Sequence, residues 1–87
     1  MYKIYFSKIA VKQIQLLKGA KLDGKAKKLI DLVSANPFQN PPPYEKLIGD
    51  MLGLYSRRIN IQHRLVYQVY EEEKAVKIVS MWSHYEY

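Results

Sequence analysis

Four side chains of this sequence have the chemistry needed to cleave RNA without a metal: Glu45, Arg58, Arg64 and His84. The 2′-hydroxyl of RNA is an internal nucleophile, so the reaction needs only a base, an acid and groups that stabilise charge on the phosphate. Glu45 would accept the hydroxyl proton, and His84 would protonate the departing 5′-oxygen. Both arginines would hold the phosphate. The products would be a 2′,3′-cyclic phosphate and a 5′-hydroxyl.

Each of these residues also has an ordinary structural interpretation. His84 near the chain end is typical of a frayed surface residue, Arg57-Arg58 of a charge pair on an edge strand, and Glu45 of a solvated loop carboxylate. A carboxylate beside two arginines is moreover a weak base. We therefore expect slow action on free RNA unless something else positions the substrate.

The elements that would position these residues form one domain over residues 1–87, because a chain of this length has room for a single core. A β-type run at Tyr2–Phe6 precedes a helix that has Ser7 as its N-cap and ends near Gly19. Asp23 is expected to cap a second helix, which ends at Asn36-Pro37. Apolar residues recur at helical spacing in both helices: Ala10, Ile14 and Leu17 in the first, and Ala26, Leu29, Ile30 and Val33 in the second.

Three β-type runs follow the segment Asn36–Pro43, which contains all four prolines and is therefore an extended connection. The runs are Leu54–Asn60, Arg64–Tyr70 and Ala75–Trp82. Their connections are short, so consecutive strands are expected to be antiparallel neighbours. The predicted fold class is α+β, with the N-terminal strand and helical hairpin packed on one face of a mainly antiparallel sheet.

Alternation along the middle run predicts which side chains face the helices. The apolar face consists of Leu65, Tyr67 and Val69. The opposite, uncovered face carries Arg64, Val66, Gln68 and Tyr70. If Ile59 points inward, Ser56 and Arg58 share that open face, which then presents two arginines.

The charge of the chain is concentrated in its first third. The formal net charge is +6, and residues 1–30 hold eight lysines against one acid, Asp23. Such an excess favours a polyanionic partner such as nucleic acid, although a solvated helix face explains it equally well. The lysines that we consider for docking on RNA are Lys8, Lys12, Lys25 and Lys28.

Composition excludes several other classes of protein. The chain has no cysteine, so a disulfide framework, a thiolate metal site and a thiol nucleophile are impossible. No apolar stretch approaches the roughly 20 residues needed to span a bilayer, and Lys3 interrupts any signal-peptide core, so we expect a cytoplasmic protein without a membrane segment. His63 and His84 lack ligand spacing, and no phosphate loop or dinucleotide fingerprint is present. We expect neither a metal nor a cofactor.

Several motifs together resemble one family. The stretch Gly53–Ile59, with sequence GLYSRRI, is followed by His63–Tyr67, with sequence HRLVY. The Asn36-Pro37-Phe38 connection, the Glu45-x-Leu47 element and the terminal His84-Tyr85 occur in the same order. In these features the chain closely resembles the YoeB (Txe/YoeB) toxins of the RelE/ParE superfamily.

This resemblance implies a RelE-like microbial ribonuclease fold and a toxin of a type II toxin–antitoxin pair that cuts mRNA in the ribosomal A site. It makes Glu45 the general base, Arg64 and Arg58 the phosphate ligands and His84 the general acid, with Tyr85 orienting the substrate. The implied partners are the ribosome, mRNA, a YefM/Phd-like antitoxin that covers the active end, and a second copy in a homodimer.

The sequence also departs from the family pattern. Ile48 stands where relatives commonly have lysine, Tyr44 where a proline usually precedes the glutamate, and Glu86-Tyr87 extend the chain beyond the usual end. Two alternatives remain open: a non-catalytic ParE-like toxin that acts on DNA gyrase, and a small basic RNA-binding module. A pure binder would not need Glu45, Arg64 and His84 together.

Overall fold

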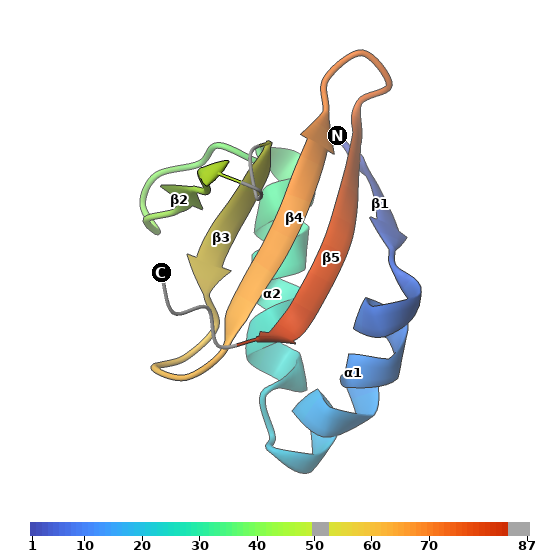
Figure 1. Cartoon of the computed structure of the whole chain (residues 1–87), viewed down its shortest axis with the longest axis vertical. Coiled ribbons are helices and arrows are strands. Elements are labelled where there is room, and N and C mark those ends of the chain that lie inside the picture. The colour runs from blue at the N-terminus through green and yellow to red at the C-terminus, as the bar shows by residue number, and fades with distance from the viewer. Residues whose placement is uncertain (50–52, 84–87) are drawn as a thin grey trace.

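A computed structural model of the chain describes residues 1–49 and 53–83. Its described helices and strands are, in chain order, β1 (Lys3–Phe6), α1 (Lys8–Gly19), α2 (Asp23–Ala35), β2 (Glu45–Lys46), β3 (Leu54–Arg58), β4 (Arg64–Tyr70) and β5 (Ala75–Ser83). The strands form one sheet in the order β1-β5-β4-β3-β2. Only the β1–β5 pair is parallel among these strands. The predicted α+β fold with a mainly antiparallel sheet is therefore confirmed (Figure 1).

The two helices pack on one side of the sheet, with α2 behind β3 and β4 and α1 nearer β5 (Figure 1). The Ser7 hydroxyl caps α1 as predicted, since its Oγ accepts a hydrogen bond of 2.9 Å from the Ala10 amide and donates one of 2.7 Å to the Val79 carbonyl. The predicted cap of the second helix is wrong. Leu22 occupies the N-cap position without a side-chain hydrogen bond, and Asp23 is the first helical residue, where its charge still complements the helix dipole.

The three predicted strands are present with small changes in their bounds. The run from Leu54 ends at Arg58 and not at Asn60, because residues 59–62 form the turn to β4, whereas β5 continues to Ser83. The sequence pattern does not predict β2. This two-residue strand pairs antiparallel with β3, so that β3 lies inside the sheet and not at its edge.

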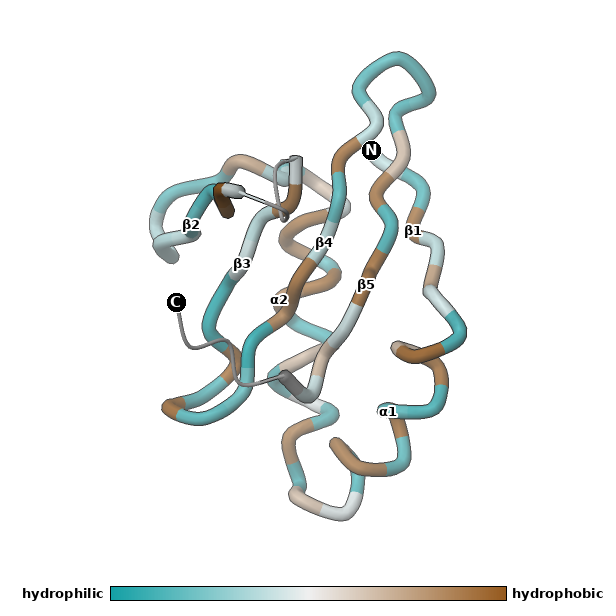
Figure 2. Tube along the Cα trace, in the orientation of Figure 1, coloured by the Kyte–Doolittle hydropathy of each residue, from teal (hydrophilic) through white to brown (hydrophobic). Residues whose placement is uncertain are grey.

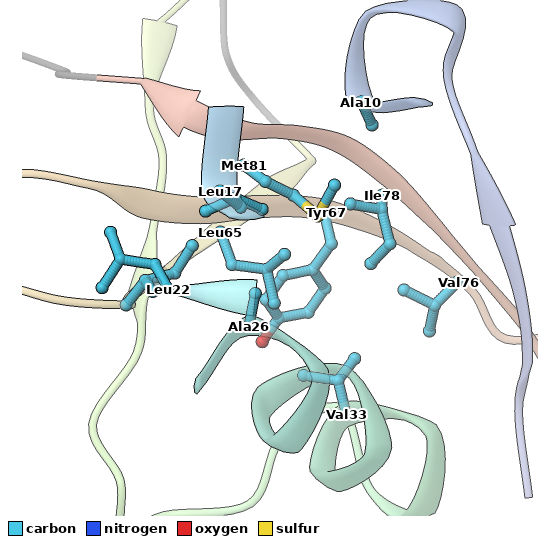
Figure 3. Close-up of a cluster of buried hydrophobic side chains, with 11 residues drawn as sticks. Ala10, Leu17, Leu22, Ala26, Val33, Leu65, Tyr67, Val76, Ile78 and Met81 are labelled. Atoms are coloured by element: carbon cyan, nitrogen blue, oxygen red, sulfur yellow. The ribbon is translucent and has the colours of Figure 1, made fainter. Parts of the chain in front are cut away.

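The core lies between the helices and the sheet (Figure 3). Leu65 and Tyr67 of β4 are fully buried in it, and Val69 packs against it, as the alternation predicts. The buried side chains that Figure 3 labels are Ala10, Leu17, Leu22, Ala26, Val33, Leu65, Tyr67, Val76, Ile78 and Met81. Figure 2 shows that β4 carries both apolar and polar positions.

Both helices of the described residues lie on one face of the sheet, so the opposite face is the one that the sequence predicts to be open (Figure 1). Ser56 and Val66 lie directly opposite each other on this face, yet both are completely buried. Arg64 and Gln68 of β4 remain partly exposed beside them. The predicted open face is thus partly exposed at Arg64 and Gln68 and closed at Ser56 and Val66.

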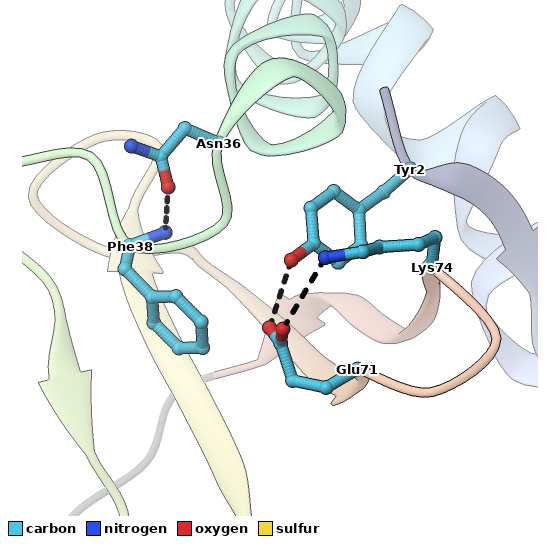
Figure 4. Close-up of polar contacts among 5 residues, drawn as sticks. All are labelled: Tyr2, Asn36, Phe38, Glu71 and Lys74. Carbon is cyan, nitrogen blue, oxygen red and sulfur yellow. Dashed lines mark hydrogen bonds and ion pairs between the residues drawn. The ribbon is translucent and has the colours of Figure 1, made fainter.

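Polar contacts fix the chain at two places (Figure 4). One is the start of the proline-rich connection, and the other lies between the residue before β1 and the turn from β4 to β5. Asn36 Oδ1 accepts a hydrogen bond of 3.0 Å from the Phe38 amide where the connection begins. Tyr2 Oη donates one of 2.8 Å to Glu71, which also lies 3.7 Å from the Lys74 ammonium. The hydrogen bond to Glu71 is the main reason why the pKa of Tyr2 is raised. Within the described ranges, no helix is both long and apolar enough to cross a bilayer.

Candidate active site

A cleft of about 530 Å³ lies at the β2–β3 edge of the sheet, on the side opposite the two described helices. One wall is the end of the proline-rich connection with Glu45, and the floor and the other wall come from β3, the β3–β4 turn and the start of β4. Its lining consists of Pro42, Pro43, Tyr44, Glu45, Ser56, Arg57, Arg58, Ile59, Asn60, Ile61 and Arg64. Three of the residues with a predicted chemical role, Glu45, Arg58 and Arg64, therefore share one cavity.

Glu45 reaches the cleft because β2 pairs with β3. Glu45 lies opposite Ser56, and the Leu47 amide, two residues further along, donates a hydrogen bond of 2.9 Å to the Leu54 carbonyl. Ser56 in turn lies opposite Val66 of β4. Residues that face each other across antiparallel strands project from the same side of the sheet, so Glu45 shares the open face with β4 side chains.

Arg58 and Arg64 are direct cross-strand neighbours at the ends of β3 and β4. Arg58 is exposed and Arg64 is partly buried, with 21% of its side chain accessible. Like charges placed opposite each other repel, which makes this pair costly unless an anion lies between or beside them. The pair is consequently suited to bind a phosphate.

Glu45 and Arg64 form the ion pair of the cleft. Glu45 Oε2 lies 3.7 Å from Arg64 Nη1, and 58% of the glutamate side chain is accessible. A pair this exposed contributes little to stability. The pair matters for chemistry because it places a carboxylate beside two guanidinium groups in a solvent-accessible cavity.

The place of Arg57 in the structure differs from the one that the sequence predicts. Arg57 is only 1% exposed, so the interpretation of Arg57-Arg58 as a surface charge pair is wrong for its first member. Arg57 points into the protein because it alternates with Arg58 and because β3 is covered on its edge by β2. Its guanidinium donates to Tyr67 Oη at 3.0 Å and to three carbonyls of the proline-rich connection. The sequence does carry a signal for this burial, because Arg57 alternates with Arg58 along the strand and therefore points to its inner face.

Tyr67 completes this buried arrangement. Its hydroxyl accepts from Arg57 Nε and donates a hydrogen bond of 2.8 Å to the Pro37 carbonyl. Burial raises the pKa of the Tyr67 hydroxyl above its usual value, and the neighbouring Arg57 charge partly opposes this increase. The hydroxyl thus stays protonated and keeps both hydrogen bonds over the ordinary pH range.

Side-chain contacts hold the β3–β4 turn at the other wall of the cleft. Asn60 Oδ1 accepts hydrogen bonds from the amides of Gln62 and His63, at 2.9 and 2.7 Å. The buried His63 ring stacks on Trp82 of β5, with centroids 3.9 Å apart and planes 17° apart. The turn is therefore attached to the strand that leads to the chain end.

His84 and Tyr85 lie outside the described residues, so their predicted roles stay predictions. The described part of β5 ends at Ser83, whose partner across the ladder is Arg64. Lys8 and Lys12 on α1 and Lys25 and Lys28 on α2 are all exposed, in the helical layer on the side of the sheet away from the cleft. In the part of the chain that the structure describes, no three or more His, Asp or Glu side chains group as a metal site would require.

A mainly antiparallel sheet with a helical hairpin on one face is a RelE-like fold, and the other face of this sheet carries a basic cleft with a carboxylate. The sequence matches the family described as YoeB-like toxin of bacterial type II toxin-antitoxin system over residues 12–85. The chain belongs to this family.

Individual relatives agree with this assignment. A Toxin YoeB from Synechocystis sp. is 36% identical over 58 residues, which are 67% of this chain and 65% of that protein. Among solved structures, a YoeB/ParE toxin from Agrobacterium tumefaciens has a TM-score of 0.86 at 28% identity, over 95% of this chain and 99% of that one. YoeB in a heterotetrameric YoeB-YefM complex from Staphylococcus aureus has a TM-score of 0.81 at 33% identity, over 98% and 99%. A YoeB dimer from the same species is equally similar in fold.

Proposed function

We propose that this protein is a ribosome-dependent mRNA endoribonuclease, the toxin of its toxin–antitoxin pair, and that it cuts mRNA in the ribosomal A site without a metal. The observation that carries the proposal is the placement of Glu45 3.7 Å from Arg64 in one open cleft, with Arg58 beside Arg64. These residues come from three strands, and they are the base and the cations that the reaction requires.

The chemistry follows from the position of each group. Glu45 removes the proton from the 2′-hydroxyl, and the freed oxygen attacks the neighbouring phosphorus. Arg64 and Arg58 hold the phosphate oxygens, on which negative charge increases as the new bond forms. The bond to the 5′-oxygen then breaks, and His84 supplies the proton that this oxygen takes. The products are a 2′,3′-cyclic phosphate and a 5′-hydroxyl.

The exposure of the base explains why a positioning partner is part of the proposal. More than half of the Glu45 side chain is accessible to water and the cleft is open, so the site by itself does little to hold RNA against the carboxylate. Such a site gains most from a substrate that is already held in the reactive geometry. The ribosome supplies this geometry, and the exposed lysines Lys8, Lys12, Lys25 and Lys28 supply contacts to its RNA.

The remaining partners belong to the same proposal. The chain binds a YefM/Phd-like antitoxin whose acidic, disordered segment covers the active end, as a basic protein with an open cationic cleft allows. A homodimer is the second assembly that we propose, by analogy with the S. aureus relative solved as a dimer. Action on ribosomes places the protein in the cytoplasm.

The test follows a defined mRNA in a purified translation system by primer extension, with ribosomes present or omitted. We expect ribosome-dependent cuts at A-site codons by the unmodified protein. Glu45→Gln and Arg64→Ala should each slow cleavage by about 100-fold or more, as loss of a general base or a charge-stabilising group does. Glu71→Gln is the matched control, because Glu71 forms an ion pair of the same 3.7 Å length outside the cleft.

Each outcome decides between the functions considered. Cleavage that needs ribosomes and fails in Glu45→Gln and Arg64→Ala but not in Glu71→Gln supports the enzyme. Absence of cleavage by the folded, unmodified protein would refute it and leave a binding toxin, for which inhibition of DNA gyrase is the next assay. Normal cleavage by Glu45→Gln would remove the base assignment alone.

A further inference from the structure

The proline-rich connection cannot hold itself in place by its own backbone. Four of the seven residues 37–43 are prolines, which have no N–H to donate. The connection still ends at Glu45 and forms one wall of the cleft. Something outside it must therefore satisfy its carbonyl groups and fix its path.

Arg57 is the main external donor, and the Tyr67 hydroxyl adds one bond to the Pro37 carbonyl. Arg57 Nη1 donates to the Pro42 carbonyl at 2.7 Å, and its Nη2 donates to the carbonyls of Pro37 at 3.0 Å and Gln39 at 2.8 Å. With the bond from Nε to Tyr67, four of the five N–H groups of a guanidinium are used. Beneath the connection, the Arg57 guanidinium carbon also lies 4.8 Å from the centre of the Tyr44 ring.

The charge of Arg57 is balanced by dipoles and not by an acid. Among the described residues, no carboxylate forms an ion pair with this nearly completely buried side chain. A buried cation without hydrogen bonds is very costly, so the carbonyls of the connection and the guanidinium depend on each other. This dependence selects a single path for the connection.

The strand that presents Glu45 is too short to fix that path alone. β2 has two residues and pairs with β3 on one side only. The Arg57 bond to Pro42 lies three residues before Glu45, and the Tyr44 ring lies directly before it in the chain. The guanidinium therefore holds the segment that leads into the base, from inside the protein.

We propose that Arg57 is a positioning residue that sets the distance between Glu45 and Arg64 by tying the proline-rich connection to the sheet. It does not bind the phosphate, because its side chain is buried, in contrast to exposed Arg58. The effect on cleavage rests on the proposed function, whereas the effect on the connection does not.

The experiment compares Arg57→Met, which keeps most of the side-chain volume but removes all N–H groups, with Arg57→Lys. Amide hydrogen exchange is measured at Gln39 and Leu47, whose N–H groups bond to the Asn36 and Leu54 carbonyls. Single-turnover cleavage of ribosome-bound mRNA is measured in parallel. Val33→Ala is the control, because it removes buried volume from α2 and lowers stability without touching the cleft.

We expect faster exchange at Gln39 and Leu47 in Arg57→Met, with little change at the α2 amide of Ala26. The maximal cleavage rate should fall by about 100-fold, as misplacement of a reacting group by about 1 Å does. The ribosome concentration that gives half-maximal rate should change by less than about threefold, since binding contacts remain. Arg57→Lys should recover part of the rate, because one ammonium cannot reach all four acceptors.

Three results would overturn the proposal. The first is unchanged amide exchange in Arg57→Met, and the second is an unchanged cleavage rate in that variant. The third is an equal loss of rate in Val33→Ala when both variants have the same free energy of unfolding. If the unmodified protein does not cut mRNA, the proposed function fails and the exchange data alone decide whether Arg57 fixes the connection. If Arg57→Met does not fold, Tyr67→Phe takes its place. It removes one acceptor of Arg57 and one bond to Pro37, and unchanged exchange in that variant would count equally against the proposal.

Discussion

The substitution Tyr67→Phe tests the buried polar arrangement under the cleft with the loss of a single atom. The Tyr67 hydroxyl accepts from the Arg57 guanidinium and donates to the Pro37 carbonyl, and the residue is completely buried. Phenylalanine fills the same core position, so no cavity of any size results. The cost is therefore the cost of the two hydrogen bonds.

The expected loss is about 2–3 kcal/mol in the free energy of unfolding. A bond to a charged group contributes about 1.5–3 kcal/mol and a neutral one about 0.5–1.5 kcal/mol. The total is at the lower part of their sum, because the Pro37 carbonyl keeps its bond from Arg57 Nη2. For a domain of this size each kcal/mol lowers Tm by about 5 °C.

The same substitution should change the dependence of stability on alkaline pH. Burial raises the pKa of Tyr67 in the folded protein, so folding favours the neutral hydroxyl. The resulting stability is complete below the unfolded-state pKa of about 10 and is lost as pH rises from there through the folded-state pKa. The difference between the unmodified protein and Tyr67→Phe should therefore shrink above pH 10, by about 1.4 kcal/mol per pH unit in that interval.

The measurement is denaturant unfolding at pH 7 and at several values above pH 10, followed by the fluorescence of the single tryptophan, Trp82. Tyr5→Phe is the control, because Tyr5 is 55% exposed, and its change should stay within about 0.5 kcal/mol. A loss below about 1 kcal/mol for Tyr67→Phe at pH 7 would refute the energetic argument. A difference that stays constant above pH 10 would refute the raised pKa.

Three further outcomes are expected. Ser7→Ala should lower the free energy of unfolding by about 1–2 kcal/mol in thermal or denaturant unfolding, since the cap to Ala10 and the bond to Val79 are both lost; a loss no larger than that of Ser7→Thr would contradict this. His84→Ala should remove most ribosome-dependent cleavage while leaving antitoxin binding and Tm unchanged, and a normal rate would exclude His84 as the acid. Replacing four lysines by glutamine should weaken ribosome binding more at low than at high salt, and an unchanged salt dependence would exclude a docking role for Lys8, Lys12, Lys25 and Lys28.

Much of the fold could be predicted because it is encoded by neighbours in the chain. The cap at Ser7 depends on an amide three residues away, and the burial of Leu65 and Tyr67 follows from alternation within one strand. The antiparallel order of β3, β4 and β5 follows from their short connections. The same local rule misplaced the second helix cap, because Asp23 lies one position inside α2.

The sequence by itself determined which groups are available for chemistry and which strand face most of them share. Alternation and the short β3–β4 connection are enough to put Arg58 and Arg64 on one face. Tertiary structure alone decided that Glu45 meets Arg64, 19 positions later in the chain, and that Arg57 is buried under carbonyls 15 to 20 positions before it. The physical reason is the separation in sequence between the residues that make each contact. Periodicity reports the contacts of a residue with its own strand or helix, whereas an isolated two-residue strand and a buried cation acquire their partners only when distant segments pack.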